Sequence, residues 1–430
     1  MKETVVNKKI TYSIVAVLLI VLVTIGATYA YFSAQASTDV QTVTTGTLTM
    51  GFTNGEIINA TGITPINDNE IETKATVLPF SVTNTGNQHM KLTIKLTDIS
   101  IDDALKDIDF RWGLYNADKQ DAAGTEMGVS FGIFKYSQTG GEEILLQDVI
   151  LDKNSATKNY KLRIWIHDDG ALQNEMQGKT FSGKVVVTGE AIEYTPETCF
   201  TMDGGTITGY DIETCGTDVV IPKTINSTSV TAIGDEAFYN EENQLKSVII
   251  PDSVINIGNG TFAMTSLSHV TIPDSVTTIY TNAFGDSGLT SVFIPESVTI
   301  FESQDPDEWS GETFAYGTNL KTIVIPGSVS NLSMGMFWEV RTLTDVVLMD
   351  GVDTILFHAF NMTGISTIEI PSSVNNIYSS WEGPFRDTEV SEIVVRGKTE
   401  APEGFGEDWN CISAVGEETC TEYANVIYRP

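Results

Sequence analysis

The pentapeptide IPDSV stands at Ile250–Val254 and again at Ile272–Val276, and IPESV follows at Ile294–Val298, so successive copies begin 22 residues apart. The prolines in this slot are Pro222, Pro251, Pro273, Pro295, Pro326 and Pro371. A phenylalanine runs in step with them, at Phe238, Phe262, Phe284, Phe314, Phe337, Phe360 and Phe385. Two markers that keep phase over such a distance indicate a solenoid, in which each repeat is one coil.

The physical reason for the phrase is visible in the copy Leu289–Val298 (LTSVFIPESV). Alternation predicts that Leu289, Val292 and Ile294 point into the coil. Pro295 has no N–H for the next strand, so it ends the ladder and starts a turn. One coil cannot bury its apolar side alone and must stack on copies of itself. The phrase is therefore architectural.

Strand residues between the inward positions must face outward, and stacking places them in two columns. One column is polar or acidic and the other is mostly apolar or β-branched. We predict a ligand-binding face there, formed by Ile249, Thr271, Phe293, Val324, Val347, His269 and Asp345. The alternative is that the apolar column only reflects the β-propensity of a sheet surface.

The N-terminus predicts export. Lys2, Lys8 and Lys9 precede the apolar run Ile14–Ile25, which is typical of a signal peptide over residues 1–30. The alternative is a retained membrane anchor, because the apolar stretch is just long enough to span a bilayer. In both cases the rest of the chain is expected outside the cytoplasm, secreted or at the cell surface, and membrane contact is expected only through this segment.

Residues 31–195 are expected to form a β-sandwich. Short runs of alternating polarity recur between turn residues, which is typical of strands with one buried face. The runs are Gly46–Phe52, Thr76–Thr83, Met90–Thr97, Lys161–His167 and Thr180–Thr188.

Charge and cysteines narrow the function classes. The chain has 57 acidic and 24 basic residues, a net charge of −33, and no basic cluster, which argues against nucleic acid as a partner.

Four cysteines in an exported chain suggest two bridges, although four cysteines allow three pairings. Local pairing, Cys199 with Cys215 and Cys411 with Cys420, is the simplest choice; four buried thiols are the alternative.

Two family resemblances follow from these motifs. The segments TYAYF at Thr28–Phe32, GTL at Gly46–Leu48 and the Phe80 strand leading into the turn Asn84–Gly86 resemble the TasA/camelysin family of exported proteins. That resemblance implies a jelly-roll-like sandwich, and the family includes biofilm fibre subunits and a described metalloprotease. The repeats, in the region 196–430 with its terminal caps, resemble the BspA-like leucine-rich repeats of bacterial surface proteins, which implies adhesion.

Other motifs have structural explanations. Gly128–Gly132 (GVSFG) matches a nucleophile-elbow pattern but lies in an all-β context, and Gly285–Gly288 (GDSG) lies in a loop of the repeat. His167–Asp169 (HDD) is interpreted as a strand-end turn. No two histidines have zincin spacing.

An acidic insertion carries the remaining candidate site. Asp305, Asp307 and Glu308 supply the oxygen ligands that calcium prefers, without the spacing of an EF-hand loop. Simple solvation is the competing interpretation, so no cofactor or metal is predicted, with calcium as the alternative.

The sequence thus predicts a mainly β protein, a jelly-roll-like β-sandwich followed by a BspA-type solenoid. Its predicted function is non-enzymatic: adhesion or protein–protein interaction with an extracellular protein or cell-surface polymer, through the solenoid. The alternatives are a fibre or biofilm-matrix subunit that self-assembles through its sandwich and, third, an exported hydrolase.

Overall fold

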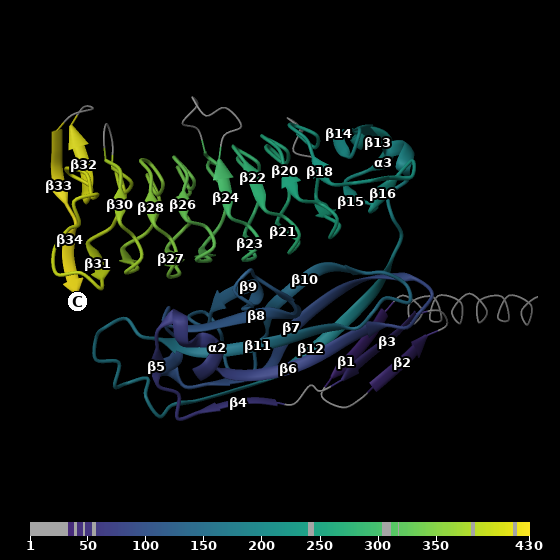
Figure 1. Ribbon diagram of the computed structural model, residues 1–430, viewed down its shortest axis with the longest axis horizontal. Helices are drawn as coiled ribbons and strands as arrows, with labels where there is room; N and C mark the ends of the chain where they lie inside the picture. Colours follow the sequence, from purple (N-terminus) through teal and green to yellow (C-terminus); the bar gives the residue numbers. More distant parts are fainter. Residues whose placement is uncertain are drawn as a thin grey trace, which may run out of the picture.

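The structure is a computed structural model that describes residues 33–37, 41–45, 48–53, 57–239, 245–302, 311–316, 318–379, 383–415 and 419–430. The predicted signal segment and the calcium candidates Asp305, Asp307 and Glu308 lie outside the described residues. Within these ranges, no helix has the length and apolar character needed to cross a membrane. Figure 1 shows a sandwich of long strands below and a row of short-stranded coils above it.

The sandwich consists of two sheets. The first sheet has five strands in the order β1-β12-β7-β10, with β4 also paired to β12. Its strands are β1 (Ser33–Ser37), β4 (Ile57–Thr61), β7 (His89–Ile101), β10 (Glu143–Leu151) and β12 (Thr180–Ile192). The second has seven, in the order β2-β3-β6-β11-β8-β9, with β5 paired to β11. Its strands are β2 (Gln41–Thr45), β3 (Leu48–Thr53), β5 (Pro65–Ile66), β6 (Thr76–Asn84), β8 (Phe110–Gln120), β9 (Glu126–Ile133) and β11 (Lys158–His167). Short helical turns η1 (Asp68–Glu70), α2 (Ile71–Lys74) and η2 (Asp103–Leu105) connect them.

Alternation explains the strands that the sequence predicted. In β7, every second residue from Met90 to Leu96 is buried between the two sheets, as a half-buried antiparallel strand requires. The turn after β6 is fixed by Asn84, whose side-chain Oδ1 accepts a hydrogen bond from the Gly86 backbone N–H at 2.9 Å.

The first residues after the predicted signal join the chain's own sandwich. β1 pairs antiparallel with the second half of β12, in a register that places Ser33 opposite Glu190 and Ser37 opposite Val186. β4 pairs with the first half of the same strand. The segment therefore completes a sheet within one subunit.

The solenoid has a strand on each of two faces of every coil. The strands on the face toward the sandwich are β15 (Asp218–Val220), β19 (Ser247–Ile249), β21 (His269–Thr271), β23 (Ser291–Phe293), β25 (Thr322–Ile325), β27 (Asp345–Leu348), β29 (Thr367–Ile370), β31 (Glu392–Arg396) and β34 (Asn425–Arg429). Those on the other face are β14 (Thr206–Tyr210), β18 (Ala232–Ile233), β20 (Asn256–Ile257), β22 (Thr278–Tyr280), β24 (Ile300–Glu302), β26 (Asn331–Leu332), β28 (Thr354–Ile355) and β30 (Asn376–Ile377). The remaining short elements are η3 (Glu197–Cys199), β13 (Phe200–Asp203), α3 (Ile212–Cys215), β16 (Thr224–Ile225), β17 (Thr228–Ser229), β32 (Cys411–Val415) and β33 (Thr419–Tyr423).

The phenylalanines of the repeat form one continuous stack inside the solenoid. Consecutive rings from Phe238 to Phe385 lie 5.3–5.8 Å apart, and from Phe284 onward they are within 8° of parallel. Tyr210 of the N-terminal cap extends the stack by one ring, at 5.2 Å from Phe238. Offset stacking of this kind adds to the burial of the rings and fixes the rise from coil to coil.

In five coils the backbone is left-handed both two residues before and two residues after the phenylalanine, at Phe262, Phe284, Phe314, Phe337 and Phe360. Around Phe337, these positions are Gly335 at φ +62° and Glu339 at φ +61°. The equivalent residues in other coils include asparagine, aspartate, methionine and tyrosine, so the sequence offers little signal for this turn.

Both local disulfide pairings are present. Cys199 bonds Cys215 and joins η3 to α3 at the N-terminal cap, and Cys411 bonds Cys420 across the hairpin β32–β33. These are the open ends of the solenoid, where a stack would otherwise expose its core and a sheet edge.

Candidate functional site: the seam between sandwich and solenoid

The sandwich covers the lower strand face of the solenoid, and we call this contact the seam (Figure 1). At its centre, the ring of Phe293 on β23 meets Trp112 on β8, edge to face, with centroids 5.9 Å apart. Beside it, Val324 and Val347 are buried together with side chains of the sandwich, Trp165 among them. The other members of this apolar cluster are Ile66, Ile71, Tyr115, Phe131, Ile133 and Met349.

Polar contacts flank the apolar centre. His269 Nε2 lies 2.6 Å from the Asp148 carboxylate, and the Thr271 hydroxyl donates to the Gln147 carbonyl at 2.6 Å. Asp345 is only 3% exposed. Its carboxylate receives the Lys135 ammonium at 2.5 Å.

The turns of the coils add further contacts. Lys119 of the sandwich pairs with Asp274 at 2.7 Å, in the second copy of the opening pentapeptide. In the third copy, Glu296 accepts a hydrogen bond from the Gly128 N–H at 2.6 Å, and the Glu296 N–H donates to the Gly128 carbonyl at 2.9 Å. The repeated phrase therefore presents one sandwich contact per coil.

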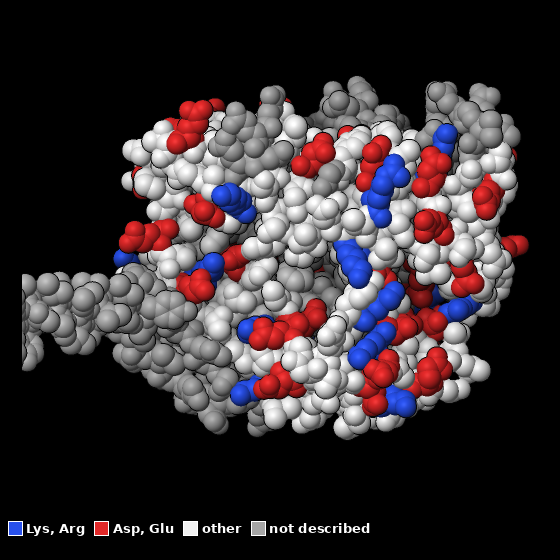
Figure 2. Space-filling model, turned by 180° about the vertical axis from the view of Figure 1, so that it is seen from behind, with Lys and Arg blue, Asp and Glu red and all other residues white. Residues whose placement is uncertain are grey.

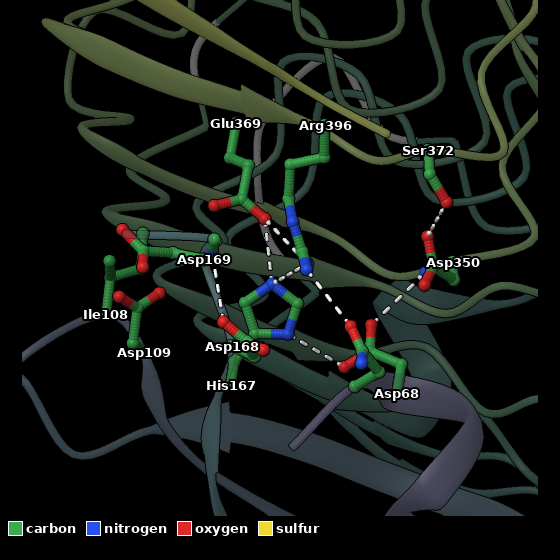
Figure 3. Close-up of polar contacts among 12 residues, drawn as sticks. Asp68, Ile108, Asp109, His167, Asp168, Asp169, Asp350, Glu369, Ser372 and Arg396 are labelled. Carbon is green, nitrogen blue, oxygen red and sulfur yellow. Dashed lines mark hydrogen bonds and ion pairs between the residues drawn. The ribbon is translucent and has the colours of Figure 1, made fainter. Parts of the chain in front are cut away.

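A charged cluster around His167 closes the end of the seam nearest the C-terminus (Figure 3). His167 is the last residue of β11 and is 2% exposed. Its Nδ1 lies 3.0 Å from Asp68 of η1, and its Nε2 lies 2.7 Å from Glu369 of β29. Arg396 of β31 places Nη1 2.7 Å from the same Nε2. The imidazole thus joins one sandwich carboxylate to two charged groups of the solenoid.

The two groups at Nε2 compete for it. A guanidinium only donates, so Arg396 bonds Nε2 when that nitrogen carries no proton. A protonated Nε2 instead donates to Glu369. Arg396 has a second anchor, because its Nη2 donates to the Asn67 side chain at 3.1 Å. The cluster can therefore hold the seam with the imidazole in either protonation state, through different bonds.

The surroundings of His167 stabilise its protonated form relative to a free histidine. Burial and the nearby Arg111 guanidinium lower the pKa of His167, but the Asp68 and Glu369 carboxylates outweigh them and raise it above its usual 6.5. Burial raises the pKa of the neighbouring Asp109 to about 6, against the opposing effects of Arg111 and His167.

The structure revises the predicted ligand-binding face. The pairing registers confirm the two columns, with His269 beside Ser291 and Thr271 beside Phe293. The chain's own sandwich, however, lies against this face and buries the apolar column around Val324 and Val347. Of the seven predicted residues, Ile249, Thr271, Val324, Val347 and Asp345 are buried, and Phe293 and His269 are partly buried. Use of these residues by an outside partner stays a prediction.

The sequence missed the sandwich half of the seam. β8, β9 and β10 were not among the predicted strands, because β8 is buried from Phe110 to Asn116 without alternation. A continuous apolar run would have been the alternative signal for a strand buried on both faces, but Arg111, Gly113 and Asn116 interrupt it. The predicted turn at His167–Asp169 is confirmed, since Gly170 and Ala171 donate their N–H groups to Asp168 and Asp169.

The two sequence motifs with a catalytic precedent have structural roles. Ser130 of the GVSFG segment lies inside strand β9 and donates its hydroxyl to the Leu145 carbonyl. Ser287 of the GDSG segment is 1% exposed and donates to the Phe284 carbonyl at 2.6 Å.

Residues 217–304 and 308–398 match a family model described as BspA type leucine rich repeat region, in six copies. The C-terminal half of the chain is a BspA-type leucine-rich-repeat region. Residues 5–131 match a second model, described as camelysin metallo-endopeptidase. Both resemblances drawn from the sequence are confirmed, and so is the mainly β fold.

Solved structures with similar repeats come from bacterial proteins. A leucine rich cell surface protein from Faecalibacterium prausnitzii is 29% identical over 46% of this chain and 52% of its own, with a TM-score of 0.34. A leucine-rich repeat protein from Bacteroides ovatus is 21% identical over 53% of this chain and 68% of its own, also at 0.34. The match thus spans about half the length of the first of these proteins. No curated protein matches the chain in sequence.

The described residues do not fit the metal that the name metallo-endopeptidase implies. His89 bonds Asp152, His167 bonds two carboxylates at the seam, and His269 bonds Asp148. His358 stacks on Trp338, far along the solenoid from the region matched by camelysin. In the part of the chain that the structure describes, no three His, Cys, Asp or Glu side chains are grouped to hold a metal ion.

The seam makes a first prediction. Replacing Phe293, Val324 and Val347 with Ser removes apolar side chains from the seam. Each change is expected to weaken the free energy of association between sandwich and solenoid by about 1.5–3 kcal/mol. The variant should keep both folded domains but unfold in two calorimetric transitions where the parent unfolds in one. Ile255→Ser, on the opposite face and 44% exposed, is the control. A single unchanged transition in the triple variant would show that the apolar centre does not hold the domains together.

A second prediction concerns pH. Because the folded pKa of His167 is raised, its contribution to stability is complete below pH 6.5 and is lost as pH rises through the folded value. The free energy of unfolding of His167→Gln should therefore be about 1–3 kcal/mol below that of the parent near pH 6, and the difference should be smaller near pH 9. Calorimetry of both proteins from pH 6 to pH 9 measures this difference. Because His167 also lowers the pKa of Asp109, which is about 6, the change between pH 7 and pH 9 is the part that reports on the histidine. A stability difference that does not change with pH would contradict the assignment.

Proposed function

We propose that this protein is a non-enzymatic bacterial surface protein that acts in adhesion or protein–protein interaction through its solenoid. The observation that carries the proposal is the seam. Six BspA-type repeats present a strand face that engages a folded protein domain with an apolar centre and regularly spaced polar contacts. Repeat solenoids commonly bind partners on such repeated surfaces.

Occupation of the lower face directs an outside partner to the other one. The upper face, with β20, β22, β24 and β30, is not covered by the sandwich (Figure 1). Exposed apolar side chains occur on or beside its strands: Ile255 is 44% exposed, Ile300 38% and Tyr378 45%. Such residues on a regular sheet suit an extracellular protein or polymer.

The charge distribution supports an extracellular, well-solvated protein. Residues 199–430 hold 33 acidic and 8 basic residues, a net charge of 8 − 33 = −25. Figure 2 shows acidic side chains scattered over the rear face, with basic side chains beside some of them in both the upper, solenoid half and the lower half. The two disulfides fit an oxidising compartment.

A third prediction tests binding through the upper face. The full exported chain is immobilised and exposed to a panel of purified extracellular proteins and cell-surface polysaccharides. Binding to the preferred partner should fall at least about tenfold in Ile255→Glu/Ile300→Glu, because each change places a charge in an apolar contact. The matched control is Leu172→Glu, since Leu172 is 85% exposed on the sandwich. Equal loss in both variants, or no partner in the panel, would count against the proposal.

A fibre subunit is the second candidate, favoured by the position of β1. This strand of five residues adds to β12 at the rim of the sandwich and precedes the rest of the domain. An equivalent strand from a neighbouring copy could make the same backbone bonds.

The fourth prediction separates this candidate from the first. If the chain assembles, deletion of residues 31–45 should abolish filaments in electron micrographs of the purified protein. Filaments that persist after the deletion would exclude strand exchange through β1, and the absence of filaments in the parent would leave the adhesive function alone.

A further inference from the structure

An acid-lined cavity of about 560 Å³ opens in the seam, between the β8–β9 hairpin of the sandwich and the coil turns that face it. From the sandwich, η1, α2, β8 and β11 contribute side chains, and the solenoid contributes the turns after β23, β25 and β27. Its volume lies within the range typical of small-molecule sites.

The cavity carries more negative charge than its own bases neutralise. Six carboxylates line it, from Asp68, Glu72, Asp121, Glu126, Glu296 and Asp350, against the single guanidinium of Arg163. Two of the six are paired, Glu126 with Lys161 and Arg163, and Asp68 with His167. The other four have no ion-pair partner within the described ranges of the chain.

Two of these unpaired carboxylates lie on the solenoid side. Glu296 accepts the Gly128 N–H, and Asp350 accepts the Ser372 hydroxyl at 3.3 Å. Burial and the nearby Asp121 carboxylate raise the pKa of Glu296, against the effect of that backbone bond and of Arg163. Burying the ionised Glu296 carboxylate without a counter-charge is unfavourable, and a cation placed beside it would offset that free-energy cost.

Tyr115 provides an independent sign of a missing partner. Its side chain is only 5% exposed, and its ring lies under the Arg163 guanidinium, 4.2 Å from the centroid. The hydroxyl lines the cavity but forms no hydrogen bond with any residue that the structure describes. Burial raises the pKa of Tyr115, and the Glu296, Asp68 and Glu72 carboxylates around the cavity raise it further. The hydroxyl oxygen is not one of the fully buried polar atoms, so the small exposed part of this side chain includes it, and a hydrogen-bond partner for it belongs in the adjoining cavity.

The rest of the lining sets the shape of the ligand. Ile71 and Met127 of the sandwich and Met349 of the solenoid add apolar surface between the charged walls. An alkyl chain fits these side chains, and an ammonium group fits carboxylates on either side of the seam. An anionic or neutral polar ligand would meet four unpaired acids.

We propose that this cavity binds a short aliphatic amine, either a free diamine or the lysine side chain of a peptide, held by Glu296, Asp350 and the Tyr115 hydroxyl. The site is separate from the upper face to which adhesion is assigned. Because its walls belong to both domains, the amine also ties the sandwich to the solenoid, and binding stabilises the closed molecule by mass action.

The test is titration calorimetry of the full exported chain with 1,4-diaminobutane and with N-acetyl-lysine methylamide. At least one of the two amines should bind. Tighter binding of 1,4-diaminobutane would identify a free diamine as the ligand, and tighter binding of N-acetyl-lysine methylamide would identify a peptide lysine. 1,4-Butanediol has the same chain without charge and should not bind. Affinity should fall about tenfold or more in Glu296→Gln, which loses a charge-assisted bond. It should fall several-fold in Tyr115→Phe, which keeps the ring.

Glu312→Gln is the matched control, because Glu312 is another partly buried carboxyl with a raised pKa and lies outside the cavity. Calorimetric unfolding shows that each variant is folded. The proposal is overturned if neither amine binds at millimolar concentration, if the diol binds as well as the diamine, or if calcium displaces the amine. It is also overturned if Glu312→Gln weakens binding as much as Glu296→Gln does.

Discussion

The rest of the structure depends on the constant rise from coil to coil, which the buried phenylalanine stack maintains. Rings 5.3–5.8 Å apart hold every coil at the same height above the last. A strand, a proline and an acidic turn therefore recur in straight columns along the outside. Straight columns allow one side of the sandwich to meet several coils at once, so Asp274, Glu296 and Asp345 all reach it.

Much of the fold could be predicted from the sequence because both domains have strict periods. The 22-residue phrase indicates the coils, and alternation indicates β6, β7, β11 and β12. Local pairing, the simplest of the three pairings that four cysteines allow, is the one present in both disulfides. Strand β8 was not predicted because its first residues are buried on both faces, which removes the alternation, and β10 was not predicted because two register shifts interrupt its pairing with β7. The left-handed turns beside each phenylalanine escaped because Asn282, Tyr316 and Met362 have no residue type in common.

The contact between sandwich and solenoid could not be predicted from local sequence patterns. Phe293, Val324 and Val347 were expected to face outward from the coils, and they do. What covers them depends on a surface about 180 residues earlier in the chain, and no local pattern encodes that contact. An apolar stripe on a sheet indicates a protein partner equally well whether the partner is another molecule or another domain. His167 was similarly interpretable only as a turn residue, since its carboxylates come from η1 and β29.

The seam determines which surfaces of the protein are available for binding, because it covers one face of the solenoid, leaves the other free and encloses the amine cavity. Zero-length carbodiimide cross-linking followed by mass spectrometry tests this arrangement most directly. The account predicts covalent links between Lys119 and Asp274 and between Lys135 and Asp345, pairs that lie 2.7 Å and 2.5 Å apart although they belong to different domains. Cross-links found only within the sandwich and within the solenoid, with neither of these two pairs, would contradict it.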